Sequence, residues 1–160
     1  MDKYYGVNRG ISYMRRSRVA ALQALYQFDF YNSKKPLKKI TEELFELYKH
    51  DYKNIEDKKH QDPLNYELIE KILPVAIAKK QEINEILEPL LKDSWKLEEL
   101  SLYIYLILRL AIAEIIQTTT DLPVIINEYI EVTKLFENSK DAKFVNSIIE
   151  TVGSLLRKNG

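Results

Sequence analysis

LSLYIYLILRLAIAEII, the sequence of residues 100–116, is apolar on every side of a helix. Only Ser101, Arg109 and Glu114 interrupt it with plainly polar side chains. The abundance of Leu, Ile and Ala, the absence of Gly and Pro, and a length beyond that of a strand favour a helix. A helix that is apolar all round needs protein or lipid on every side. The stretch therefore predicts a helix at the centre of the fold.

Protein is the better surrounding for this helix than lipid. A membrane span needs about 20 apolar residues, and charged Arg109 stands near the middle of this shorter stretch. The N-terminus lacks the apolar run of a signal peptide, and the absence of cysteine fits a reducing cytosol. We therefore expect a soluble, cytoplasmic protein, and 160 residues indicate one domain, residues 1–160.

Apolar residues recur at helical spacing along the rest of the chain, and four glycines and five prolines are too few for many β-turns. Pro74 is expected to kink or divide the segment 63–91. The expected helices cover residues 15–29, 37–48, 63–91 in one or two pieces, 100–116, 124–136 and 144–156. The pattern predicts an all-α fold of about seven helices and no strand.

Catalysis has little support in the sequence. The chain has no cysteine, no Gly-rich phosphate loop and no Gly-x-Ser-x-Gly motif. His50 and His60 lie near the two ends of a charged connection, residues 49–62, but no cysteine or carboxylate cluster completes a closed metal site with them. We interpret them as surface histidines and expect no enzyme activity, metal or cofactor.

The first 28 residues form the only strongly one-signed stretch of a chain whose 24 basic and 24 acidic residues balance. Arg15, Arg16 and Arg18 fall where a helix is expected to start, so the helix dipole opposes them. Such a break of a local rule tends to mark function. Arginine binds phosphates through a planar fork and stacks on splayed bases, which suits single-stranded RNA. The alternative is a solvated basic end. If the arginines bind RNA, we expect their replacement by alanine to weaken binding and to leave thermal stability almost unchanged or slightly raised.

Four blocks of the sequence resemble the NusB family, in the order in which that family has them. The blocks are RRSRVAALQALY at 15–26, LRLAIAE at 108–114, PVIINEYIEVTKLF at 123–136 and KFVN at 143–146. The resemblance spans residue 15 to about residue 157. It implies two three-helix bundles packed crosswise about a long shared helix, preceded by a flexible basic tail over residues 1–14.

The resemblance also implies a function. Members of this family are RNA-binding transcription antitermination factors that pair with NusE, a small-subunit ribosomal protein, on the boxA element of nascent ribosomal transcripts, within the RNA polymerase antitermination complex. No catalysis and no small-molecule substrate are implied. At two positions the chain departs from the family: Ala113 replaces a frequent aromatic residue, and Ile104 replaces a frequent acidic residue implicated in the partner contact.

Residues from both ends of the chain are expected to contact RNA. Besides the three arginines, Tyr26 could stack a base if its ring face is exposed; otherwise it is a core tyrosine. Lys140, Lys143 and Asn146 lie near the start of the last helix, where backbone N–H groups can also meet a phosphate. We expect them to extend the basic surface of the arginines, although Asn146 could instead brace a neighbouring helix.

Arg109 needs a partner inside the fold, because a lone buried guanidinium is very costly. Glu114 lies about 140° around the same helix and is poorly placed. Glu128 interrupts the apolar run that starts the following helix. We therefore predict a largely buried ion pair between Arg109 and Glu128 with a structural role.

Two other functions remain open from the sequence. The first is an α-helical adaptor that binds protein only, its basic end being incidental. The second is an enzyme module of the kind that precedes some RNA methyltransferase domains, but 160 residues leave no room for a cofactor-binding α/β domain.

Overall fold

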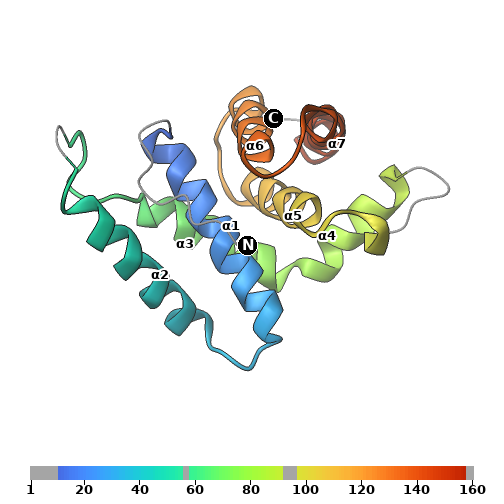
Figure 1. Ribbon diagram of the computed structural model, residues 1–160. Coiled ribbons are helices and arrows are strands. Elements are labelled where there is room, and N and C mark those ends of the chain that lie inside the picture. Colours follow the sequence, from blue (N-terminus) through green and yellow to red (C-terminus); the bar gives the residue numbers. More distant parts are fainter. Residues whose placement is uncertain (1–10, 56–57, 92–96, 158–160) are drawn as a thin grey trace. The chain divides into compact units, whose positions relative to one another are not determined.

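Helices make up most of the computed structural model, which describes residues 11–55, 58–91 and 97–157 (Figure 1). Within these ranges no strand occurs, which confirms the predicted all-α class. The helices are α1 Tyr13–Tyr31, α2 Leu37–Tyr52, α3 Tyr66–Ala78, α4 Lys80–Leu87, η1 Glu88–Leu90, η2 Leu97–Glu99, α5 Leu102–Gln117, α6 Leu122–Phe136 and α7 Ser139–Leu156.

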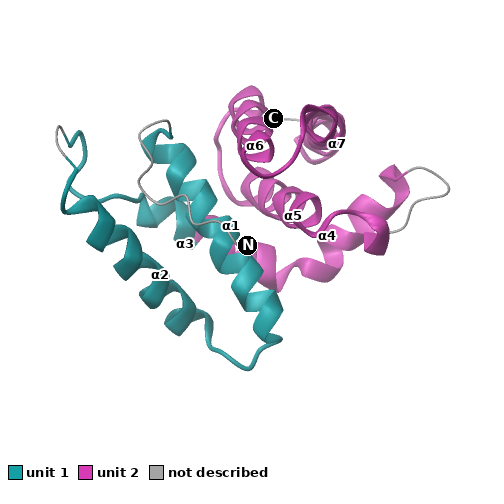
Figure 2. Cartoon of the chain, viewed as in Figure 1, with its two compact units in different colours: residues 1–70 teal, residues 71–160 magenta. Residues whose placement is uncertain are grey.

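The chain divides into two compact units, residues 1–70 and 71–160 (Figure 2). The first unit holds α1, α2 and the start of α3, and the second holds the remainder of α3 and the helices from α4 to α7. The expected flexible tail, residues 1–14, lies mostly outside the described residues. Tyr13 and Met14 already belong to α1, and Ile11 is buried, so the described end of that segment is ordered.

Helix α5 is buried on all sides over most of its length, as the apolar stretch predicts. Every residue from Leu106 to Ile115 is buried. In the second unit α5 packs against α6 and α7, which also pack against each other, and α4 contacts α5 (Figure 1). Ser101 caps the first turn, its Oγ accepting a hydrogen bond from the backbone of Ile104. Among the described residues no helix is long and apolar enough to cross a membrane.

The two charged residues inside α5 are fully buried, and each makes polar contacts within the second unit. Arg109 donates from Nη2 to the carbonyl oxygen of Ala76 at 2.9 Å, and its guanidinium lies 5.5 Å from the centroid of the Tyr105 ring. The carbonyls in the last turn of a helix lack an intrahelical partner, so Arg109 caps the end of α3. Glu114 accepts a 2.7 Å hydrogen bond from the hydroxyl of Tyr129.

A second arginine caps the end of α5. Arg157, just after α7, donates to the carbonyl oxygens of Ile115 at 3.1 Å and Thr118 at 2.7 Å, and also to that of Thr120. A cation at a helix C-terminus is favoured by the helix dipole as well as by these hydrogen bonds. Arg157 therefore joins the C-terminal end of α7 to the C-terminal end of α5.

Several boundaries differ from those that the sequence predicts, and the last helix, α7, begins at Ser139, five residues before the expected start at residue 144. Pro74 lies inside α3, and the division from α4 comes later, at Lys79, which leaves the helical region of backbone angles. Helix α2 runs one turn beyond its expected end because Tyr52 continues the buried stripe at intervals of four residues. That stripe consists of Ile40, Leu44, Tyr48 and Tyr52.

The pairing of Arg109 with Glu128 remains a prediction, and Glu128 is half-buried. We expect Arg109→Ala to lower the unfolding free energy by about 3–5 kcal/mol, because a buried charged network loses one member. If the pair exists, Arg109→Ala and Glu128→Ala will couple by at least about 0.5 kcal/mol in a double-mutant cycle on urea midpoints. Glu131→Ala, on the same helix, should be additive with Arg109→Ala. Additive losses for Glu128→Ala as well would show that the pair does not form.

Tyr66 gives a prediction about alkaline pH. Its hydroxyl is buried without a hydrogen-bond partner among the described residues, and burial raises its pKa to about 12. An unfolded tyrosine ionises near pH 10. Because the folded protein resists ionisation of Tyr66, this residue should leave the free energy of unfolding unchanged below about pH 10 and lower it as the pH rises towards 12.

Removing that hydroxyl should therefore stabilise the protein. We expect Tyr66→Phe to raise the unfolding free energy by about 1 kcal/mol and to reduce the loss above about pH 10. Urea midpoints measured from about pH 8 to about pH 12 test this. Tyr52→Phe is the control, because the Tyr52 hydroxyl donates a 2.6 Å hydrogen bond to the His60 carbonyl oxygen and its removal should destabilise. A less stable Tyr66→Phe variant would contradict the assignment.

Candidate nucleic-acid interface

The predicted arginines lie in the first two turns of α1, where they oppose the helix dipole as expected. Ser12 is the N-cap residue but makes no side-chain capping hydrogen bond, and the first turn contains no acidic residue. Arg15, Arg16 and Arg18 are therefore the charged residues at this end of the helix. Their environments differ sharply.

Arg16 is a structural residue. Its side chain is buried, Nε donates to the carbonyl oxygen of Pro63 at 2.7 Å, and Nη1 donates to that of Ile11 at 3.2 Å. The guanidinium also lies 5.7 Å from the centroid of the Tyr52 ring. Burial lowers the pKa of Arg16 from its ordinary value. The side chain thus ties the start of α1 to the segment before α3.

Arg18 is also buried, whereas Arg15 is half-buried. All residues from Arg16 to Leu25 are buried, so α1 is enclosed on every side in its middle, like α5. Two observations explain this in a helix with polar residues. Ala20, Ala21 and Ala24 allow close approach of neighbouring elements, and buried Gln23 accepts a 2.6 Å hydrogen bond from the Tyr48 hydroxyl. The sequence predicts three accessible arginines at this helix start, but Arg16 and Arg18 are buried and only Arg15 of the three is partly accessible.

Tyr26 lies at the point where α1 emerges from the core. It is half-buried, and its ring is parallel to that of Phe30, at 6.3 Å between centroids and 12° between planes. Phe30 is 70% exposed and meets the ring of Tyr31 edge-on at 5.3 Å. Tyr26 is thus not a fully buried core tyrosine, and its suggested contact with a base stays a prediction.

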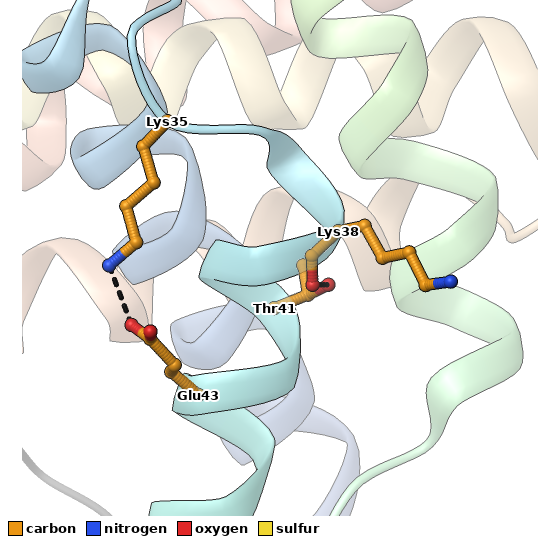
Figure 3. Close-up of polar contacts among 4 residues, drawn as sticks. All are labelled: Lys35, Lys38, Thr41 and Glu43. Carbon is orange, nitrogen blue, oxygen red and sulfur yellow. Dashed lines mark hydrogen bonds and ion pairs between the residues drawn. The ribbon is translucent and has the colours of Figure 1, made fainter.

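Lys35, in the turn after α1, and Lys38, in the first turn of α2, are already paired with acids. Lys35 Nζ lies 2.6 Å from Glu43 Oε2 and 5.0 Å from the centroid of the Tyr31 ring; this ion pair raises the pKa of Lys35 and lowers that of Glu43 (Figure 3). Lys38, beside Thr41 in the same view, is 87% exposed and lies 4.0 Å from Glu42. Such exposed pairs contribute little to stability.

Lys140 and Lys143 are exposed near the start of α7, and Asn146 is half-buried. Their spacing of three residues keeps them within about a third of the helix circumference. Asn138, the N-cap residue, accepts hydrogen bonds on Oδ1 from the backbone N–H groups of Lys140 at 2.9 Å and Asp141 at 3.2 Å. These two amides are therefore already satisfied, and the contact of this helix start with a phosphate stays a prediction that rests on the exposed lysine side chains.

The two departures from the family pattern are both inside the fold. Ile104 is 2% exposed and Ala113 is completely buried. Neither side chain can make an extensive contact with a partner protein at its surface. Among the described residues, no group of three histidine, aspartate or glutamate side chains is arranged to hold a metal ion.

The contacts of Arg16 predict a loss of stability on its replacement, whereas the sequence alone predicts almost no change. We predict that Arg16→Ala lowers the unfolding free energy by about 2 kcal/mol or more, because the carbonyls of Ile11 and Pro63 lose their donor. Arg16→Met, which keeps the length of the side chain, should also destabilise. Lys143→Ala, at an exposed position, should change the free energy of unfolding by no more than about 0.5 kcal/mol. An unchanged midpoint for Arg16→Ala would contradict the role of these hydrogen bonds.

Comparison with known proteins places the chain in a family. The model of the NusB family matches residues 15–154. The transcription antitermination protein NusB of Listeria monocytogenes serotype 4a (strain HCC23) is 31% identical over 140 residues, which cover 86% of this chain and 94% of the relative.

Solved structures agree with this result. T. maritima NusB has a TM-score of 0.69 and 26% identity, covering 90% of this chain and 92% of that chain. A crystal structure of the antitermination factors NusB and NusE in complex with dsRNA has a TM-score of 0.67 and 24% identity, covering 88% of this chain and 96% of that chain, and supports the likeness in fold. The chain belongs to the NusB family.

Proposed function

We propose that the protein is an RNA-binding transcription antitermination factor that acts on boxA-type single-stranded RNA together with NusE. The observation that carries the proposal is the family match over residues 15–154, which includes the basic start of α1 and most of α7. A relative matched over 94% of its length is named a transcription antitermination protein. We further propose that both compact units work as one RNA-binding domain, in the cytoplasm and without catalysis.

We assign the contacts with RNA to the side chains that solvent can reach. Half-buried Arg15 and exposed Lys140 and Lys143 supply cations for phosphates, and Tyr26 supplies a ring face for a base. Asn146 can add a hydrogen bond from its amide. Arg16 and Arg18 act mainly by shaping the start of α1, because they are buried.

NusE is the proposed protein partner, within the RNA polymerase antitermination complex. A solved structure of similar fold contains NusB, NusE and dsRNA. In this chain the contact with NusE cannot use the Ile104 side chain, which is 2% exposed. We therefore expect the partner to be held by other residues than the acidic one that many members have at that position.

Salt dependence tests the proposed RNA binding. Neutralising three or four phosphates of a single strand predicts a slope of log affinity against log salt of about −2 to −3. Replacing Arg15, Lys140 and Lys143 together by Ala should weaken binding and flatten the slope by up to about 2, or about 0.7 per lost contact. Fluorescence anisotropy of a labelled boxA-type single strand measures both quantities.

The matched control removes three exposed lysines outside the proposed interface. Replacing Lys38, Lys39 and Lys134 by Ala deletes the same net charge and should leave the slope nearly unchanged. A duplex of the same sequence should bind more weakly than the single strand. If the wild-type chain shows no RNA binding, alone or with NusE, it is an adaptor for protein only and the proposal fails.

A further inference from the structure

Two aromatic rings are stacked at the surface beside the start of α1. The rings of Tyr13 and His60 lie 3.6 Å apart between centroids with 9° between their planes, a close face-to-face stack. Tyr13 is the first residue of α1, and His60 belongs to the segment between α2 and α3. His60 is exposed although Tyr13 covers one of its faces. Because Tyr13 covers one face of the imidazole, the exposed surface of His60 lies outside that stacked face.

The segment that carries His60 is fixed in place by hydrogen bonds that do not involve its ring. The hydroxyl of Tyr52 donates to the His60 carbonyl oxygen at 2.6 Å, and Arg16 donates to that of Pro63 at 2.7 Å. The backbone N–H of Asn65 donates to Ser17 Oγ at 2.8 Å. These bonds hold the backbone of the segment, and the stack on Tyr13 holds the ring, so binding to the ring costs little conformational entropy.

The charges around the stack suit a nucleic-acid strand. Lys58 and Lys59 are exposed on the same segment, and Lys58 Nζ lies 5.1 Å from the centroid of the Tyr52 ring. Asp62 is the opposing charge; after burial, it is the next cause that raises the pKa of Tyr13. Two exposed lysines thus precede the exposed His60 on the same segment, and one acid follows it. Cations along the chain beside an aromatic ring are the usual arrangement for stacking a base and holding its phosphates.

We propose that the exposed face of His60, supported by Tyr13, stacks a base of the single-stranded RNA bound at the start of α1, while Lys58 and Lys59 contact its backbone. This inference rests on the proposed function and adds a contact on the segment between α2 and α3. A merely structural stack would serve to pin that segment to α1, but the hydrogen bonds from Arg16 to Pro63 and from Asn65 to Ser17 already do so.

Three variants separate a binding role from a structural one. His60→Ala removes the ring and should weaken the affinity for the boxA-type single strand by about fivefold or more, the lower range for loss of one stacked base. His60→Phe keeps an aromatic face and should retain most of the affinity. His50→Ala removes the other histidine, exposed at the end of α2, and should bind like the wild type. Thermal unfolding of each variant checks that the fold is kept.

Abasic RNA identifies the stacked base directly. A series of oligonucleotides, each lacking one base, should contain a position at which loss of the base weakens binding to the wild type but not to His60→Ala. Equal affinity of His60→Ala and the wild type would overturn the inference and leave the proposed function intact. Weak binding of both His60→Ala and His60→Phe, with no such position in the series, would also overturn it. Absence of any RNA binding by the wild type would overturn the proposed function itself.

Discussion

Hydrogen bonds from arginine side chains to backbone carbonyls hold this structure together at its helix ends. Arg109 caps α3, Arg157 caps the end of α5, and Arg16 joins the start of α1 to Pro63. A buried guanidinium is costly unless its donors are used, and unpaired carbonyls at helix ends are costly as well. Arg109 and Arg157 satisfy carbonyls at or just after the ends of helices, and buried Arg16 satisfies those of Ile11 and Pro63. In the first unit the hydrogen bond from Arg16 to Pro63 positions the segment that carries His60.

The sequence predicts the helical framework well because burial leaves a clear pattern there. The apolar stretch at residues 100–116 becomes α5, enclosed on every side as expected. The equal enclosure of α1 is not apparent from the sequence, because alanines and Gln23 make its composition look amphipathic. The helix also continues past Pro74 and ends only before Lys79. Tertiary contacts, such as that of Arg109 with Ala76, outweigh the tendency of proline to end a helix.

The candidate interface is predicted in composition but not in detail. Charge alone cannot distinguish Arg15 from buried Arg16 and Arg18, although the helical spacing of Arg18 from Leu22 and Leu25 places it on a core stripe. The capping role of Asn138 could have been found from its position before a helix start. The stack of Tyr13 and His60 could not, because its partners are far apart in the sequence and only the fold brings them together.

Photo-crosslinking is the most direct test of the proposed RNA contacts of Arg15, Lys140 and Lys143. The protein is irradiated with a boxA-type single strand containing 4-thiouridine, and the cross-linked peptides are mapped by mass spectrometry. Cross-links are expected in residues 13–15 and 58–60 of the first unit and in residues 140–146 of the second. Cross-links confined to one unit, or located on the exposed face of α2, would contradict these contacts.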